Sequence, residues 1–314
     1  MSFWVVLGYA APILALYLTL GWLVSVRLHD ASIVDVMWGP GFALVAAVGA
    51  WGGAGDPVRK FLMLAMVSVW SLRLAIHIFL RNYPSHGSKG EDYRYRAMRE
   101  RQGPRFVWLS AFTVFGLQGA LLLLIAMPLA AATSVAGRSA DPGSETAGLG
   151  PFDFAGIALF LVGFFFEAVG DAQLARFKAD PANRGKVCDV GLWRYSRHPN
   201  YFGDATLWWG FYLVACSVPG GWRTIGSPLV MTVLLLKVSG VALLERGLKA
   251  IVALTGARGG AIRLVPPSGG SLKLACSVGL PPEILANEHL VDADCGMCGA
   301  ALRTDDVQVH DAHI

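Results

Sequence analysis

The stretch Gly191-Leu-Trp-Arg-Tyr-Ser-Arg-His-Pro-Asn-Tyr-Phe-Gly-Asp204 places cations, hydrogen-bonding groups and turn residues between two strongly apolar segments. Polar groups beside a membrane are costly, so they usually have a function. Arg194, Arg197 and His198 are suited to hold phosphate, since a guanidinium group offers a bidentate fork. Pro199 disfavours the α region for the residue before it, which predicts a turn followed by the start of a helix. The alternative is a basic cytoplasmic loop, which the positive-inside rule predicts for any membrane protein.

The apolar segments around this stretch indicate the class of protein. The chain has 314 residues, of which 54% are hydrophobic and only 15% are charged. Helices are the expected spanning elements, because lipid offers backbone groups no hydrogen-bond partner. Seven stretches approach or exceed the length of a span, namely residues 3–26, 33–52, 61–80, 107–132, 152–172, 201–219 and 226–246. The predicted fold is therefore an all-α, seven-transmembrane-helix bundle in the bilayer, with a small α/β or disordered C-terminal tail.

Basic residues gather in two of the predicted loops. The loops after the third and fifth spans carry Arg81, Lys89, Arg94, Arg96, Arg99, Arg101 and Arg105, and Arg176, Lys178, Arg184, Lys186, Arg194 and Arg197. The opposite side carries only Arg59, Lys60, Arg138 and Arg223. The positive-inside rule then predicts an external N-terminus and a cytoplasmic C-terminus. The net charge of +4 reflects these loops, so no nucleic-acid partner is predicted.

Asp35 lies in the first turn of the second predicted span. One interpretation is a capping-turn acid stabilised by the helix dipole, with Ser32 as the N-cap. The other is an intramembrane acid that orients a cofactor or a substrate. The charged run from Lys89 to Arg99 has the same ambiguity, since it suits either an amphipathic surface helix or a functional segment.

Charged side chains also occur inside the third and fifth predicted spans. The third span ends in cations at four-residue intervals on one helical face, which are Arg73, His77 and Arg81. The fifth span closes with Glu167 and Asp171. Acids inside a span need a partner, and Arg176 and Lys178 are the nearest cations along the chain.

Three motifs resemble the signatures of one family. They are the stretch Gly191–Asp204, Asp35-x-x-Trp38-Gly39 and Gly90-Glu-Asp-x-Arg94-Tyr95. They resemble the membrane steroid 5-alpha-reductase superfamily, most closely its bacterial branch of DUF1295 proteins, over about residues 1–248. The resemblance implies an NADPH-dependent oxidoreductase acting on CH–CH groups, in a bacterial inner membrane. Its substrate would be an activated C=C bond in a steroid-like or other lipid or isoprenoid enone.

The resemblance also implies roles for individual residues. In one ungapped register, Asp171, Lys178, Lys186, Asn200 and Asp204 fall on positions that contact NADPH in eukaryotic members of the superfamily. The full set of expected NADPH contacts is Arg81, Arg94, Asp171, Lys178, Lys186, Arg197, His198, Asn200, Tyr201 and Asp204. The Gln-Glu pair and the Tyr that polarise the steroid ketone in those enzymes have no clear match here. Asp35 and Tyr95 are therefore the candidates for the catalytic acid.

Residues 249–314 form a foreign tail, where the family's basic, Tyr-rich C-terminal segment is absent. Residues 261–265 and 271–278 are predicted as the two strands of a hairpin. Residues 252–310 resemble the opening half of a GAF sensor domain. Cys295-Gly-Met-Cys298 is a single CxxC without a second pair, so no metal site is predicted.

Two other functions stay open at this point. An isoprenylcysteine-type methyltransferase also carries an Arg-His-Pro-x-Tyr motif and uses S-adenosylmethionine, although the Gly-Glu-Asp-Tyr-Arg-Tyr motif argues against it. The other is an inactive membrane anchor that carries a sensory fragment, which the loss of the family's C-terminal segment favours. The sequence indicates no particular oligomeric state.

Overall fold

The computed structural model describes residues 1–83, 90–136, 148–183 and 187–238, together with the backbone of three short strands between residues 260 and 291. The chain divides into two compact units. The first comprises Met1–Ala168 and Phe202–Thr232, and the second comprises Val169–Tyr201 and Val233–Ile314. Helices α8 and α9 each cross from one unit into the other.

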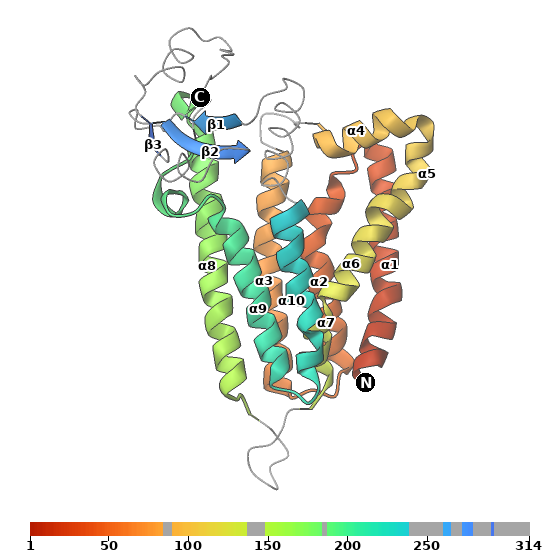
Figure 1. The fold of residues 1–314 in the computed structure, drawn as a ribbon. Helices are drawn as coiled ribbons and strands as arrows, with labels where there is room; N and C mark the ends of the chain where they lie inside the picture. Colours follow the sequence, from red (N-terminus) through yellow and green to blue (C-terminus); the bar gives the residue numbers. More distant parts are fainter. Residues whose placement is uncertain are drawn as a thin grey trace. The chain divides into compact units, whose positions relative to one another are not determined.

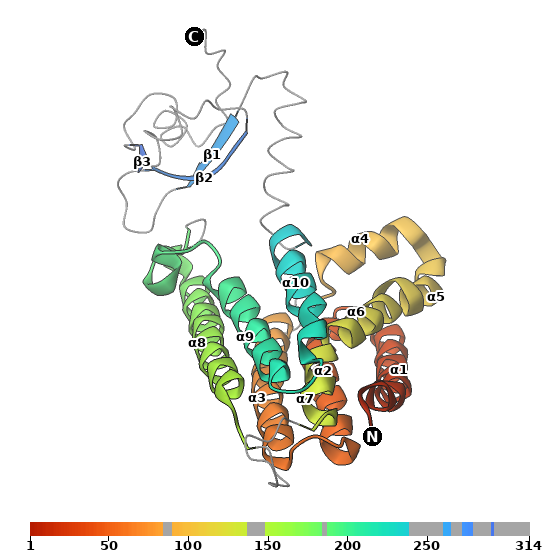
Figure 2. The same cartoon turned by 60° about the horizontal axis from the view of Figure 1, so that its bottom comes forward.

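The first unit consists of helices, and α1, α2 and α3 lie side by side in both views (Figures 1 and 2). Its long helices are α1 (Phe3–Leu28), α2 (Ile33–Gly52), α3 (Pro57–Asn82) and the first part of α8 (Pro151–Ala179). Shorter helices follow α3, namely α4 (Tyr93–Gln102), η1 (Gly103–Arg105), α5 (Phe106–Ser110), the π-helical η2 (Ala111–Gly116), α6 (Leu117–Ile125) and α7 (Met127–Ser134). The unit closes with most of α9 (Pro199–Cys216), then η5 (Gly221–Ile225) and α10 (Gly226–Val233). The π-helical η6 (Leu234–Val238), which follows α10 in the chain, belongs to the second unit.

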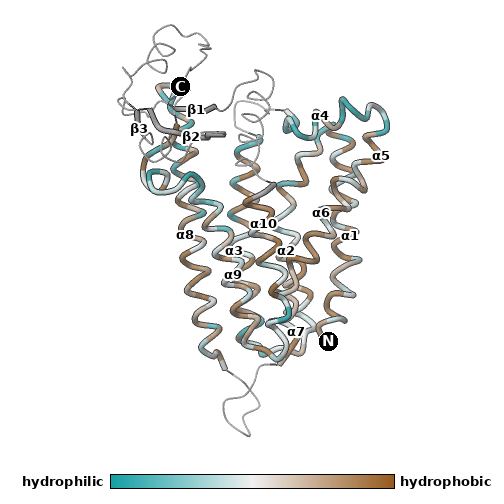
Figure 3. Tube along the Cα trace, in the orientation of Figure 1, coloured by the Kyte–Doolittle hydropathy of each residue, from teal (hydrophilic) through white to brown (hydrophobic). Residues whose placement is uncertain are grey.

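Among the described residues, five helical segments are long and apolar enough to cross a membrane: Phe3–Leu28, Ile33–Gly52, Pro57–Asn82, Tyr93–Ile125 and Pro151–Ala179. Large apolar side chains on their outer faces are more than half exposed, as Leu16, Phe61 and Leu161 illustrate. Figure 3 shows apolar residues along these helices and hydrophilic ones at α4. These features are those of a membrane protein.

The predicted count of seven spans is not confirmed. The sixth predicted span corresponds to α9, which is not among the five segments, because polar and small residues interrupt its apolar run. The seventh corresponds in part to a shorter apolar helical stretch, Gly221–Leu236, and its remainder at 239–246 lies outside the described residues. The all-helical character of the membrane part agrees with the prediction.

The interior of the first unit is an aromatic core. Phe42, Trp70, Trp208 and Phe211, from α2, α3 and α9, are all fully buried. The Phe42 and Trp208 rings lie 4.7 Å apart and the Trp70 and Trp208 rings 5.5 Å apart, both edge to face. This geometry is the one that aromatic quadrupoles favour. The cluster therefore fixes α2, α3 and α9 against one another.

Glycines bring α8 and α9 into backbone contact. A Cβ atom at Gly163 would lie 2.5 Å from the Gly203 carbonyl oxygen, and one at Gly156 would lie 2.6 Å from that of Gly210. Gly156 and Gly163 are seven residues apart on α8, as Gly203 and Gly210 are on α9, so the contacts recur along one face. Small residues at such seams allow close van der Waals packing in a membrane.

Gly163→Leu is expected to destabilise the protein by about 1–3 kcal/mol or more, because the new side chain collides with backbone rather than with a movable side chain. The thermal unfolding midpoint in detergent measures the effect. Gly8→Leu on α1 is the matched control, since a Cβ there meets nothing within 4 Å. Equal midpoints for the two variants would contradict the close α8–α9 contact.

The second unit contains the end of α8, the short turns η3 (Pro181–Asn183) and η4 (Gly191–Arg194), and the first residues of α9. It also contains β1 (Gly260–Leu264), β2 (Leu272–Val278) and β3 (Leu290–Val291). β2 pairs antiparallel with both other strands, and a bulge interrupts the β1–β2 register between Ile262 and Arg263. The two predicted strands of the tail coincide with β1 and β2 to within a residue or so. Most of the proposed GAF-like region, including Cys295 and Cys298, lies outside the described residues.

Candidate functional site

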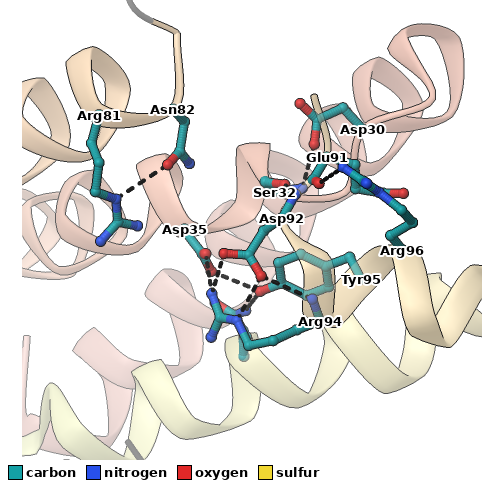
Figure 4. A network of polar contacts seen from close by, with 11 residues as sticks. Asp30, Ser32, Asp35, Arg81, Asn82, Glu91, Asp92, Arg94, Tyr95 and Arg96 are labelled. Atoms are coloured by element: carbon teal, nitrogen blue, oxygen red, sulfur yellow. Dashed lines mark hydrogen bonds and ion pairs between the residues drawn. The ribbon is translucent and has the colours of Figure 1, made fainter. Parts of the chain in front are cut away.

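In the first unit, the start of α2 and the start of α4 bring three predicted site residues together (Figure 4). The Tyr95 hydroxyl donates a hydrogen bond to Asp35 Oδ1 at 2.7 Å, and Arg94 Nη2 lies 2.9 Å from Asp35 Oδ2. The Tyr95 residue is only 7% exposed, whereas the Arg94 side chain is 52% exposed. The cluster thus has a buried phenol, a carboxylate and a cation that faces outward.

The connection before α4 holds this cluster in place. The Asp92 backbone N–H donates to Ser32 Oγ at 2.7 Å, and the Ala31 N–H donates to Glu91 Oε1 at 2.8 Å. Asp92 also caps α4 by accepting from the Arg94 N–H. Burial opposes ionisation of Asp92, but hydrogen bonds and charge from Arg94 outweigh it and hold its pKa below the ordinary value. Asp92 therefore stays a carboxylate at neutral pH and keeps Arg94 oriented.

More polar contacts surround the same connection. Arg99 donates two hydrogen bonds to Glu91, at 2.9 and 2.8 Å. The Tyr83 hydroxyl donates to Asp30 Oδ2 at 2.6 Å, and burial together with this bond raises the pKa of Tyr83. Arg81 Nε donates to Asn82 Oδ1 at 3.2 Å, and its charge contributes to the lowered pKa of Asp92. Arg81 thus belongs to the electrostatic surroundings of the cluster.

Gln118 on α6 is a member of the cluster that the sequence analysis missed. Its Nε2 donates to the Tyr95 hydroxyl oxygen at 3.3 Å. Because that oxygen accepts from Gln118, the Tyr95 proton is directed toward Asp35. The available signal was that Gln118 is the only polar side chain in the α6 sequence Leu-Gln-Gly-Ala-Leu-Leu-Leu-Leu-Ile.

The predicted partner of Glu167 was wrong. Glu167 is paired with α3, where Arg73 Nη1 lies 2.6 Å from Glu167 Oε1 and Trp70 Nε1 donates to Oε2 at 3.0 Å. The expectation had rested on closeness in sequence, which favoured Arg176 and Lys178. The structure instead supplies a cation 94 residues away, because α3 and α8 meet in the first unit.

The second unit holds most of the predicted cofactor residues. Asn200 Nδ2 donates to Asp171 Oδ1 at 2.9 Å, which joins the start of α9 to the end of α8. The His198 and Tyr201 rings are stacked, with centroids 5.0 Å apart. Burial, and then the charge of Arg197, lower the pKa of His198, so its ring is neutral at pH 7 and offers a hydrogen bond rather than a charge.

Two hydrogen bonds join the turn before α9 to α8. The Leu192 N–H donates to Gln173 Oε1 at 2.9 Å, and Trp193 Nε1 donates to the Gly170 carbonyl at 2.8 Å. Gly191 has a φ of +58° and lies against Gln173, so a side chain there would be both strained and obstructed. The cationic turn therefore has a defined position on the end of α8.

The other residues predicted to contact NADPH do not all lie in the same unit. Lys178 and Arg197 are exposed in the second unit. Asp204 is half-buried on the part of α9 that belongs to the first unit. Lys186 lies outside the described residues. Within the described residues, no group of three or more His, Cys, Asp or Glu side chains is arranged to hold a metal ion.

Comparison with known proteins gives the family. A family model described as "Protein of unknown function (DUF1295)" matches residues 21–252, which is more than half of the chain. The chain belongs to the DUF1295 family. The family match begins within α1 and covers α2 to α10, and with them both the Asp35 cluster and the Gly191–Asp204 stretch.

Two curated proteins resemble this DUF1295 chain. An uncharacterized protein of Schizosaccharomyces pombe is 28% identical over 215 residues, which cover 61% of this chain and 59% of that protein. A probable O-methyltransferase, ustE, of Ustilaginoidea virens is 40% identical over 80 residues, or 26% of this chain and 27% of that protein. The chain therefore spans less than two thirds of the length of these relatives. No solved structure matches it.

Proposed function

We propose that this DUF1295 protein is an NADPH-dependent membrane reductase of an activated C=C bond in a lipid-derived enone, steroid-like or isoprenoid. The observation that carries the proposal is the Tyr95–Asp35 hydrogen bond of 2.7 Å, with Arg94 on the other carboxylate oxygen. A buried phenol whose proton has a fixed direction is suited to general acid catalysis.

The reduction adds a hydride to one carbon of the double bond and a proton to the other. NADPH, when bound, supplies the hydride. Tyr95 hydrogen-bonds the carbonyl oxygen of the acceptor in place of Asp35 and protonates it when the β carbon receives the hydride, which gives an enol. Tautomerisation of the enol to the ketone then places a proton on the α carbon. Asp35 holds the phenol before the substrate arrives, and Arg94 balances the negative charge of that carboxylate. Gln118 donates to the phenol oxygen throughout and stabilises the negative charge that remains when the proton leaves.

The second unit contains groups that fit a dinucleotide phosphate. Arg176, Lys178 and Arg194 are exposed cations that make no ion pair among the described residues. Free cations of this kind suit phosphate groups. The carboxylate of Asp171 suits a ribose hydroxyl, and the Asn200 amide holds that carboxylate in place. These residues, with Arg197, His198, Tyr201 and Lys186, are assigned to the cofactor, and Asp35 and Tyr95 to the substrate.

Asp171→Ala and Asn200→Ala are expected to weaken NADPH binding by roughly tenfold to a hundredfold each, since each removes a hydrogen bond that involves a charged group. Fluorescence titration of the detergent-purified chain with NADPH measures this. Asp180→Ala is the control, because it removes an exposed acid from the same unit. NADPH binding that is absent in the unmodified chain, or equally weak in all three variants, would contradict the assignment.

We also propose that the end of the first unit that carries α4 is cytoplasmic. Arg96, Arg101 and Arg105 lie there, and the N-terminal amine of Met1 donates to the Gly52 carbonyl where α2 ends. The positive-inside rule then predicts that the N-terminus is outside and that this basic end of the first unit is inside. Applied to the second unit by itself, the same rule predicts that its basic residues and the C-terminus are cytoplasmic, where NADPH is available.

A second candidate is a methyltransferase that uses S-adenosylmethionine. The observation in its favour is the 80-residue match to a relative named as a probable O-methyltransferase. Titration of the same preparation with S-adenosylmethionine separates the two functions. If that cofactor binds and NADPH does not, the methyltransferase replaces the reductase, and if neither binds, an inactive membrane anchor is the better description.

A further inference from the structure

A lipid-facing groove in the first unit lies between α1 and the η2–α6 segment. Its volume is about 420 Å³. It is lined by Ala15, Leu18 and Trp22 of α1 and by Phe115, Gly119 and Ala120 of η2 and α6, among others. A Cβ at Gly119 would lie 2.6 Å from Leu18 Cδ1, so the two helices meet at the floor of the groove.

The walls of the groove offer no free hydrogen-bonding side chain. The Thr19 hydroxyl, which is part of the lining, already donates to the Ala15 carbonyl at 2.7 Å. The Trp22 indole N–H donates to the Val107 carbonyl at 3.0 Å. An occupant therefore gains only from apolar contact, which is what a hydrocarbon chain provides.

The groove is long and narrow. The lining runs on α1 from Ala11 to Trp22, a rise of about 16 Å at 1.5 Å per residue, and a volume of about 420 Å³ over that length gives a mean cross-section of roughly 25 Å². A single extended hydrocarbon chain fits this shape.

The Trp22 end of the groove has aromatic and cationic groups. The Trp22 and Trp108 rings lie 5.7 Å apart, and Trp108 is 69% exposed, as expected for an aromatic side chain at the headgroup level. Arg105 lies two residues before Val107, whose carbonyl accepts from Trp22. Arg105 is exposed, and within the described part of the chain it has no ion pair and no side-chain hydrogen bond.

From these features we infer that the groove binds an anionic membrane phospholipid, with one acyl chain between α1 and α6 and the phosphate at Arg105. The contrast with Arg94 and Arg99 supports this, because those arginines of the same region are paired with acids of the protein. The lipid would hold α1 to the segment that carries Tyr95 and Gln118. This inference is independent of the reductase proposal.

Native mass spectrometry of the full chain tests the inference, with phosphatidylglycerol and phosphatidylcholine of identical acyl chains as probes. Phosphatidylglycerol is expected to be retained more strongly. Arg105→Gln is expected to reduce that preference by about fivefold, which is the usual effect of one basic residue near an anionic surface. The control is Arg223→Gln, an exposed arginine of η5.

Substitutions that fill the groove test binding of the acyl chain separately from binding of the phosphate. Ala15→Phe with Ala120→Phe places two rings in the groove from exposed positions, and is expected to abolish retention of both lipids. Leu20→Phe on α1, at an exposed position outside the lining, is the control. The inference fails if the two lipids bind equally, if the controls lose as much as the test variants, or if filling the groove changes only the oligomeric state.

Discussion

Asp153→Asn is expected to lower the free energy of unfolding by about 3–5 kcal/mol, because it leaves a buried guanidinium without its counter-charge. Arg59 Nε and Nη2 donate to the two Asp153 carboxylate oxygens at 2.8 and 2.9 Å. The two side chains are 2% and 0% exposed. Thermal unfolding of the purified protein in detergent measures the loss.

The surroundings of the pair explain why the loss is large. Asp153 also accepts from the Gly150 N–H at 2.8 Å, so its carboxylate fixes the start of α8 as well as Arg59. Arg59 Nη1 is already buried without a hydrogen-bond partner among the described residues. Removal of the carboxylate therefore leaves a buried cation with one weaker hydrogen bond, from Nη2 to the Gly148 carbonyl at 3.3 Å, and with the more distant charge of Asp56.

Two further variants test whether the loss of stability comes from an unpaired buried charge. Arg59→Met combined with Asp153→Leu removes both charges, and is expected to cost less than Asp153→Asn alone, since an apolar pair needs no compensation. Arg223→Ala removes an exposed arginine and is expected to change the midpoint little. If the double variant is the least stable of the three, the pair is a net contributor to stability and the argument from an unpaired charge is wrong.

Three residues of the candidate site could be predicted from the sequence, because they lie in short motifs. Asp35 was a candidate because it is an acid at the start of an apolar span, whereas Arg94 and Tyr95 were candidates because their motif resembles a signature of the family. The structure brings these three together, whereas their roles in catalysis and cofactor binding stay predictions. The family assignment, which rested on the same motifs, is confirmed over residues 21–252.

Contacts between distant helices could not be predicted in the same way. Arg59 had been counted as a loop cation of the outer side, but it is buried against Asp153. Glu167 had been given partners on its own helix end, but its partner is Arg73 of α3. Periodicity shows which face of a helix is polar and not which helix lies opposite, so pairings of this kind need the packed structure. Gln118 was missed for the same reason, since a single amide in an apolar run has no local partner.

Tyr95→Phe is expected to reduce enone reduction by about a hundredfold to ten-thousandfold, which is the usual contribution of a general acid, while NADPH binding stays unchanged. Phenylalanine keeps the buried ring and loses only the hydroxyl that binds Asp35 and Gln118. The matched control is Tyr93→Phe, because Tyr93 lies two residues away on α4 and is 64% exposed. Turnover of NADPH with a panel of enone lipids, measured in detergent, gives the comparison.

Gln118→Leu separates the acid from the group that positions it. The phenol of Tyr95 remains in this variant, but nothing on α6 donates to its oxygen, so we expect a smaller loss of turnover, about tenfold, from one missing hydrogen bond. Gln118→Glu reverses the polarity at the same place, because a carboxylate accepts the Tyr95 proton in competition with Asp35. Its loss should therefore exceed that of Gln118→Leu although its shape is closer to glutamine. Equal losses of turnover for these two variants would show that Gln118 acts through packing alone. Full activity of Tyr95→Phe would show that Tyr95 takes no part in the chemistry, and Asp35 would then be the remaining candidate acid.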